Sequence, residues 1–256
     1  MIQVASADFT ASGLGRFTRV GCSGWQYRHW RGLFYPPGLP QREWLSHYAS
    51  RFNTVEINST FYGLPSEESV SRWGQMVGDD FIFTVKGGRL ITHTRRLATV
   101  DAEVDRFCQR MRLLQHKLGP VLWQLPPSLQ RDDRRLEGFL GTLAPDVQHV
   151  VEFRHISWWH PEVYGLLKAF RVAICCLDMP GFTSPAVCTA DCVYVRFHGR
   201  EHLYNGSYDA PTLNEWATTL VGMLPVGGRA YAYSNNDAHA YATENALTFA
   251  HMLGAS

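Results

Sequence analysis

The chain has 256 residues, with 24 lysines and arginines against 23 aspartates and glutamates, so its formal net charge is only +1. This balance does not support a general electrostatic attraction to nucleic acid or to an acidic membrane. Charged residues make up 18% of the chain and aromatic residues 13%, a combination that excludes a disordered chain and a coiled coil.

The first 18 residues contain neither a basic start nor an apolar stretch of signal-peptide length. We therefore expect a flexible leader over residues 1–18 and a single domain over residues 19–256. The longest apolar run after the leader, residues 172–177, is far shorter than the roughly 20 residues that span a bilayer, so we expect no membrane insertion. The six cysteines include no CxxC pair, which favours reduced thiols in a cytoplasmic protein.

Eight short runs rich in β-branched and aromatic residues follow, each closed by turn or polar residues. They begin on average 30 residues apart, which is the length of one strand, one crossover helix and two loops. The spacing therefore predicts alternating strands and helices. The runs cover residues 19–24, 54–60, 81–87, 120–126, 149–155, 172–178, 192–199 and 229–237.

Helical patterns separate these runs, with Ser66 and Asp101 as the expected N-caps of two helices. The connection 179–191 contains two prolines and a glycine, so we expect little or no helix there. Eight strands, seven helices and one degenerate connection predict an α/β fold of the (β/α)8 TIM-barrel type. A doubly wound open sheet is the alternative, but CSGW follows the first strand where that fold carries a glycine-rich fingerprint. The helical patterns cover residues 40–52, 66–77, 101–118, 131–143, 161–170, 211–224 and 238–253.

Polar and ionisable residues close nearly every predicted strand. The C-terminal ends of the strands of a TIM-type barrel share one mouth, so these residues are expected to form a ring. Buried charges are costly unless they pair or act, which leaves two interpretations open. One is a structural network of ion pairs, for example Glu152 with Arg196 or Glu56 with Lys86, and the other is a functional site. The ring comprises Ser23, Trp25, Glu56, Asn58, Lys86, Gln124, Glu152, Arg154, Asp178, Arg196, His198, Asn235, Asn236 and Asp237.

Two further features favour a binding site at this mouth. Residues 81–100 contain no acidic side chain, and a glycine pair follows Lys86, so Lys86 and His93 are candidates for binding an anion. Aromatic side chains such as Trp25 and Tyr62 lie in the loops that follow the strands, where flat rings suit stacking on sugars or bases.

The sequence resembles the YecE-like family of TIM-barrel proteins, also described as domain of unknown function 72. The resemblance covers nearly the whole chain after Arg19, with the motifs in order, and it implies the barrel fold but no established reaction. The matching stretches are GCSGW (21–25), FYP (34–36), NTVEINSTFY (53–62), FTVKGGRLITH (83–93), LGPVLWQLPP (118–127), VEFRHISWW (151–159), VYVRFHG (193–199) and YSNNDAHA (233–240).

The ring favours an enzyme of hydrolase, lyase or isomerase type that uses metal-free acid/base chemistry. Its expected substrate is an anionic polyhydroxylated small molecule, such as a sugar phosphate, a sugar acid or a nucleotide fragment. Glu152 or Glu56 would be the base and His198 its proton partner. The expected substrate-binding residues are Lys86, Arg154, Arg196, His93, Asn58, Tyr62, Trp25, Gln124, Asn235 and Asn236.

Two other classes remain as alternatives. The first is a divalent-metal site resembling those of sugar isomerases and apurinic endonucleases, with Glu152, Asp178, His198 and Asp237 as ligands. Arg154 and Arg196 would stand beside such a metal and oppose it, so no cofactor is favoured. The second is a non-catalytic module that binds nucleic acid or protein, which the net charge does not favour.

Overall fold

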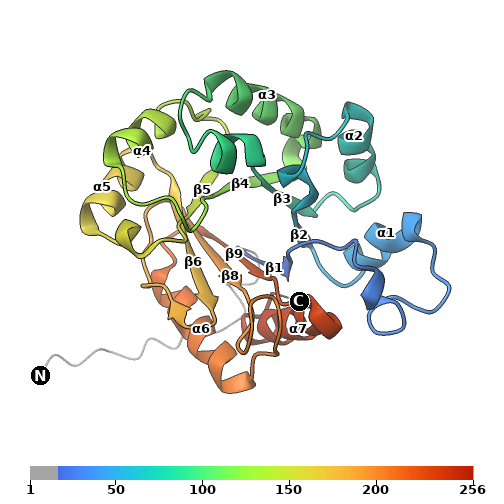
Figure 1. The fold of residues 1–256 in the computed structure, drawn as a ribbon. Helices are drawn as coiled ribbons and strands as arrows, with labels where there is room; N and C mark the ends of the chain where they lie inside the picture. The colour runs from blue at the N-terminus through green and yellow to red at the C-terminus, as the bar shows by residue number, and fades with distance from the viewer. Residues whose placement is uncertain (1–16, 256) are drawn as a thin grey trace, which may run out of the picture.

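The structure is a computed structural model in which residues 17–255 are described. Eight parallel strands form one sheet that curves into a nearly closed barrel, and the helices lie on its outer face (Figure 1). The order of strands around the sheet is β1-β9-β8-β6-β5-β4-β3-β2. The prediction of a TIM-type barrel is confirmed.

Each of the eight parallel strands overlaps one predicted run. Most of the predicted runs extend past the end of the strand, because their last residues already belong to the loops of the mouth. The strands are β1 (Thr18–Cys22), β2 (Thr54–Ile57), β3 (Ile82–Lys86), β4 (Leu118–Gln124), β5 (His149–Glu152), β6 (Ala173–Met179), β8 (Cys192–Phe197) and β9 (Arg229–Ser234).

Seven α-helices connect the strands, as the sequence pattern predicts. Ser66 caps α2 by accepting a hydrogen bond from the backbone N–H of Ser69. Asp101 is the first residue of α3 and Val100 holds the N-cap position, so the prediction of Asp101 as a cap is wrong by one residue. The helices are α1 (Trp44–Ala49), α2 (Glu67–Gln75), α3 (Asp101–Met111), α4 (Asp133–Leu140), α5 (Pro161–Ala169), α6 (Ala210–Met223) and α7 (Tyr241–Met252).

The connection between β6 and β8 has no helix, in agreement with its prolines and glycine. Instead, the two-residue strand β7 (Phe182–Thr183) turns back and pairs with the end of β6 in antiparallel register. Gly181 makes this turn with a φ of 76°, a left-handed conformation that glycine adopts without strain. The segment then returns to β8 without covering the barrel with a helix.

The barrel closes between β1 and β2 through few backbone contacts. A single parallel bridge joins Ser23 to Glu56. Below it, the Tyr48 hydroxyl accepts a hydrogen bond from the Cys22 N–H over 2.7 Å and donates one to the Thr54 carbonyl over 3.1 Å. A side chain of α1 therefore takes the place of the missing ladder, and the bridge at Ser23 and Glu56 lies directly at the mouth.

Alternate residues of the strands point into the barrel, as β geometry requires. Below the mouth the interior is filled mainly by apolar side chains and tyrosines, with the Thr54 and Thr84 hydroxyls bonded to Tyr233 and Tyr194. The apolar part of the interior consists of Leu122, Val150, Ala173, Cys175, Cys192, Tyr194, Tyr231 and Tyr233.

The predicted leader lies outside the described residues up to position 16. Thr18 belongs to β1, so the barrel starts one residue earlier than the predicted boundary of 18/19. Within residues 17–255, no helix combines the length and the apolar character that crossing a membrane requires.

Candidate active site at the barrel mouth

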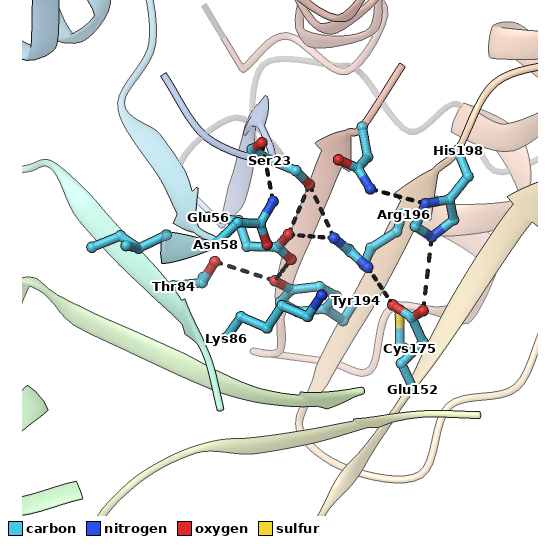
Figure 2. Close-up of polar contacts among 12 residues, drawn as sticks. Ser23, Glu56, Asn58, Thr84, Lys86, Glu152, Cys175, Tyr194, Arg196 and His198 are labelled. Atoms are coloured by element: carbon cyan, nitrogen blue, oxygen red, sulfur yellow. Dashed lines mark hydrogen bonds and ion pairs between the residues drawn. The ribbon is translucent and has the colours of Figure 1, made fainter. Parts of the chain in front are cut away.

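Four charged side chains form a buried layer across the mouth end of the barrel interior, which we call the ion-pair layer: Glu56, Glu152, Arg154 and Arg196. Arg196 lies at its centre with 1% of its surface exposed. Its Nη1 donates to Glu152 Oε2 and its Nη2 to Glu56 Oε1, each over 2.6 Å (Figure 2). Arg154 donates from Nε to the other oxygen of Glu152. One guanidinium thus joins strands β2, β5 and β8.

Two hydroxyl groups complete the hydrogen bonding of the Glu56 carboxylate. The Tyr194 hydroxyl donates to Oε2 over 2.6 Å, and the Ser23 hydroxyl donates to Oε1 over 2.7 Å. Tyr194 precedes Arg196 by two residues on β8 and therefore lies on the same face of the strand. Glu56 is consequently held by three side chains from the interior and the β1–β2 seam.

His198 continues the inward face of β8 just past the end of the strand. Arg154 donates from Nη2 to His198 Nε2 over 2.8 Å, and the side-chain amide of Asn235 lies 3.0 Å from Nδ1. Because arginine only donates, Nε2 is the acceptor, and we assign the proton of the neutral ring to Nδ1. The Asn235 nitrogen Nδ2 lies 3.0 Å from Nδ1, and because a protonated Nδ1 can donate only to an oxygen, we assign this amide the flipped orientation.

These contacts decide the ionisation of the layer. Burial alone would raise the pKa of Glu152, but the guanidiniums of Arg154 and Arg196 outweigh burial and hold that pKa well below its usual value. Burial, Arg154 and Arg196 together lower the pKa of His198 well below its usual value. At neutral pH Glu152 is therefore a carboxylate with weak basicity, and His198 is a neutral ring with no proton to donate as an imidazolium.

Above the ion-pair layer lies a cavity of about 430 Å³, which we call the mouth cavity. This volume is within the range of small-molecule sites. Six of the predicted site residues line the mouth cavity: Trp25, Asn58, Tyr62, Lys86, Arg196 and Asn235. The rest of its wall comes from Gly24, Gln26, Tyr27, Ser59, Tyr204 and Asp237.

Lys86, the last residue of β3, differs from the other cations of the site. Among the described residues it has no ion pair or hydrogen bond to its amine, and Figure 2 draws it with no dashed line. Its Nζ lies 4.3 Å from the centre of the Phe61 ring, a cation–π distance. Burial, followed by the charge of Arg196, lowers the pKa of Lys86 to about 8, although Glu152 and Glu56 oppose this.

Two other buried polar atoms of residues lining the mouth cavity lack a protein partner within the described part of the chain. They are Nε of Arg196 and Oδ1 of Asn58. The Nδ2 of Asn58 donates to the backbone carbonyl of Ser23 over 3.1 Å, so the amide is held in place with its oxygen free. An unpaired buried polar atom is costly, and both atoms belong to residues that a ligand in the cavity can reach.

The two ion pairs proposed from the sequence have different outcomes. Glu152 and Arg196 do pair. Lys86 does not pair with Glu56, because Arg196 occupies the Glu56 oxygen that faces the barrel centre. The predicted network of ion pairs is thus present between Glu152 and Arg196, and among the described residues it does not include Lys86.

Seven of the predicted residues lie outside the mouth cavity. Glu56, Glu152, Arg154 and His198 lie in or beside the ion-pair layer, and their predicted roles in catalysis and binding stay predictions. Gln124 is half-buried at the end of β4.

His93 and Asn236 do not line the mouth cavity, and their predicted binding roles stay predictions. His93 lies in the π-helix Leu90–Thr94, where Nδ1 contacts the Thr92 hydroxyl and the ring packs edge-on to Phe61. Asn236 is fully buried and donates to the Gly206 carbonyl and to Asn245 Oδ1, so it holds the loop after β8.

The alternative set of metal ligands is not brought together. Asp178 accepts hydrogen bonds from Tyr208 and Trp216, away from Glu152. Asp237 lies on the cavity wall with its Oδ2 3.6 Å from His29 Nε2. Within residues 17–255, no three or more His, Cys, Asp or Glu side chains are grouped as metal ligands would be. In the described residues the four ligands of this alternative therefore do not form one cluster.

Sequence reasoning missed Tyr194 and gave Asp237 a different role. Tyr194 could have been found, because it alternates with Arg196 and His198 on one strand and must therefore share their face. Asp237 lies on the cavity wall, and burial raises the pKa of its carboxyl. No sequence signal distinguishes that environment from the one of an exposed aspartate.

The comparisons with known proteins agree with this fold. The UPF0759 protein YecE of Escherichia coli strain K12 is 35% identical over 137 residues, which are 53% of this chain and 48% of YecE. The aligned part thus spans about half the length of that relative. The UPF0759 protein YunF of Bacillus subtilis strain 168 is 24% identical over 269 residues, covering 91% of this chain and 94% of YunF.

Solved structures show the same architecture. The DUF72 family protein TM1631 of Thermotoga maritima MSB8 matches with a TM-score of 0.83 and 27% identity, over 93% of this chain and 99% of that one. The DUF72 family protein EF0366 of Enterococcus faecalis V583 matches with a TM-score of 0.80 and 21% identity, over 93% and 96%, which supports the fold. A model of the family described as "Protein of unknown function DUF72" matches residues 19–256, and the chain therefore belongs to the DUF72 family.

Proposed function

We propose that the protein is an enzyme that acts on an anionic, polyhydroxylated small molecule in the mouth cavity, without a resident metal. The observation that carries this proposal is the charge of the site. Two guanidiniums balance two carboxylates in the ion-pair layer, so the Lys86 ammonium has no counter-charge there. A phosphate or carboxylate group in the cavity would supply one.

The polar groups around Lys86 suit the rest of such a substrate. The free Oδ1 of Asn58 can accept a hydrogen bond from a hydroxyl group, and Arg196 Nε can donate one. Trp25, Tyr27 and Tyr62 add aromatic surface to the same wall. Aromatic rings beside hydrogen-bonding amides are a common way to bind sugars, because a sugar ring has an apolar face and polar edges.

Proton transfer in this proposal belongs to groups on the cavity wall. Lys86 and Asp237 both line the cavity, and their environments move their pKa values toward each other, downward for Lys86 and upward for Asp237. Such a pair can exchange protons near neutral pH. Glu152 and His198 then act as positioning residues that hold Arg196 and Arg154, which revises the roles expected from the sequence.

Matched pairs of compounds test the proposal. Ribose 5-phosphate and gluconate are compared with ribose and glucose, by thermal unfolding and by proton NMR for turnover. At a concentration 100 times Kd, a ligand adds about 2.7 kcal/mol to the stability and raises Tm by roughly 5–10 °C. We expect this rise for an anionic member only, and its loss in Lys86→Met but not in Arg42→Met, whose side chain is 81% exposed.

Two outcomes contradict the proposal. Equal binding of the neutral sugars would remove the role of the uncompensated charge. Turnover that persists in Lys86→Met, with an unchanged KM, would place the reaction elsewhere.

A further inference from the structure

The position of Lys86 allows more than binding an anion. Lys86 ends a strand of the barrel and lines the mouth cavity, and its amine lies over the Phe61 ring without a hydrogen bond or ion pair among the described residues. A lysine that serves only to balance charges of the protein itself would be expected to lie against a carboxylate. The two carboxylates whose charges act on Lys86, Glu56 and Glu152, are instead paired with Arg196.

The backbone around Lys86 is held firmly. The Thr60 hydroxyl donates to the Lys86 carbonyl over 2.7 Å. The next residue, Gly87, packs so closely on Trp123 that an added Cβ would lie 2.2 Å from the indole ring. The loop after β3 therefore leaves the barrel in one direction, and the lysine side chain extends from a fixed base. A nucleophile benefits from such positioning, because less motion is lost when it reacts.

The surroundings of the amine favour its neutral form. Burial, the largest influence, removes water from the ammonium, and Arg196 and Arg154 repel it, while Glu152 and Glu56 attract it. With a pKa of about 8, roughly a tenth of the amine is neutral at pH 7, against about one part in three thousand for an exposed lysine with a pKa near 10.5. The neutral amine has the free electron pair that a nucleophile needs.

We infer that Lys86 is the nucleophile of this cavity and forms an imine with a substrate that carries an aldehyde or ketone group beside its anionic group. The inference rests on the proposed function and narrows its substrate to a carbonyl compound. The protonated imine keeps the positive charge of Lys86 beside the anionic group, and Arg196 Nε, which has no partner among the described residues, can donate a hydrogen bond to the same group.

The chemistry balances without an oxidant or reductant. The lone pair of the Lys86 nitrogen attacks the carbonyl carbon, and the carbonyl π electrons move to oxygen, which takes up a proton. The nitrogen loses one proton, which gives a carbinolamine. Its hydroxyl takes up a second proton and leaves as water, while the nitrogen lone pair forms the C=N bond of the protonated imine. The Asp237 carboxyl is on the same wall and can donate and recover these protons. The protonated imine then withdraws electrons from a C–H or C–C bond of the neighbouring carbon, and water finally releases the amine.

Reductive trapping tests the inference directly. The protein is incubated with dihydroxyacetone phosphate, ribose 5-phosphate or pyruvate and reduced with sodium borohydride, and adducts are located by peptide mass spectrometry. The chain has only three lysines, so the map is simple. We expect an adduct of the probe at Lys86 that exceeds any adduct at Lys168, which is exposed, by at least tenfold.

Control variants and a competitor separate the possible results. Lys86→Arg should abolish trapping, Lys168→Arg should leave it unchanged, and both are checked for a native thermal transition. Glycerol 3-phosphate has the anion but no carbonyl, so an excess should suppress trapping in the unaltered protein. This competition needs no variant and remains valid if Lys86→Arg fails to fold.

The trapping and competition results distinguish failure of the imine from failure of the anion site. Adducts spread evenly over the three lysines, or retained in Lys86→Arg, overturn the imine. A rise in Tm with glycerol 3-phosphate but no adduct from any probe overturns the imine and leaves the anion site of the proposed function standing. Trapping at Lys86 that glycerol 3-phosphate does not reduce supports the imine and overturns the anion site.

Discussion

The ion-pair layer and the mouth cavity are adjacent and share Arg196, but their polar groups differ in whether they have partners. In the layer, each carboxylate accepts from at least one guanidinium at hydrogen-bond distance. In the cavity, a lysine amine, one guanidinium nitrogen and one amide oxygen have no partner among the described residues. Buried polar groups are normally satisfied, so the layer has the character of structure and the cavity that of a binding site.

The number of charged residues at the barrel mouth therefore does not indicate how many of them are available to bind a ligand. Glu152 and Arg196 look as suitable for chemistry in the sequence as Lys86 does. Hydrogen bonds within the layer occupy both oxygens of Glu152 and both terminal nitrogens of Arg196. Burial is the largest cause of the lowered pKa of Lys86; Arg196 and Arg154 of the layer add to it without a hydrogen bond to the amine, and Glu152 and Glu56 oppose it.

The largest expected effect comes from removing the centre of the layer. Arg196→Met leaves Glu56 and Glu152 buried with one partner fewer, and breaking a buried pair in this way costs about 3–5 kcal/mol. We expect the free energy of unfolding in urea to fall by that amount. Arg171→Met is the control, because Arg171 is 82% exposed in its pair with Asp191, and we expect a change below about 0.5 kcal/mol. Equal effects of the two variants would show that the layer does not stabilise the fold.

Glu152→Gln tests the charge of the layer and keeps its shape. We expect a loss of about 2 kcal/mol at pH 7, since the amide cannot match the hydrogen bonds of a carboxylate to arginine. Because the folded-state pKa of Glu152 is below the usual 4.5, the advantage of the unaltered protein is complete above pH 4.5 and disappears as the pH falls through the folded-state value. Denaturation at pH 7 and pH 3 measures this difference. A constant difference at both pH values would contradict the assignment.

Lys86→Met should act in the opposite direction and stabilise the fold. The pKa of Lys86 is lowered from 10.5 to about 8, so burial of its ammonium destabilises the fold. This cost has its full value below pH 8 and disappears as the pH rises through 10.5. We expect a gain of about 1–3 kcal/mol at pH 7 that shrinks by pH 10, measured by chemical denaturation.

Lys117 provides a matched control for that variant. It is also mostly buried, but its ammonium donates to the carbonyls of Gly74 and Val77 over 2.8 and 3.0 Å. Lys117→Met should therefore destabilise the fold by about 1–3 kcal/mol. If both variants change stability in the same direction, the difference between a satisfied and an unsatisfied lysine is not the cause.

The smallest effect on stability is expected for Tyr62→Ala on the cavity wall. Tyr62 is 82% exposed, so the free energy of unfolding should change by less than about 0.5 kcal/mol. An aromatic ring that stacks on a ligand contributes about 1 kcal/mol, so we expect Kd for an anionic sugar to rise about fivefold in calorimetric titration. Tyr241→Ala is the reference, because Tyr241 is half-buried outside the cavity lining and its loss should leave Kd unchanged. An unchanged Kd in Tyr62→Ala would remove Tyr62 from the site.

Much of the fold could be predicted from the sequence, because it depends on local patterns. The runs 54–60 and 192–199 show the two-residue alternation and the polar endings of barrel strands. The prolines and the glycine of residues 179–191 disfavour a helix in that connection whatever packs against it. The family motifs extend over the same segments. Asp101 shows the limit of this approach, since a one-residue shift of a helix start depends on how the preceding loop packs.

The sequence by itself determined which residues reach the mouth, because a strand that alternates with period two sends every second side chain inward. Only the tertiary structure decided which charges pair there. Arg196 is long enough to contact Glu56 and Glu152 from a strand that is adjacent to neither β2 nor β5 in the sheet, and the stagger and curvature of the barrel set those distances. Lys86 is left without a carboxylate for the same reason, and no local pattern in the chain records that outcome.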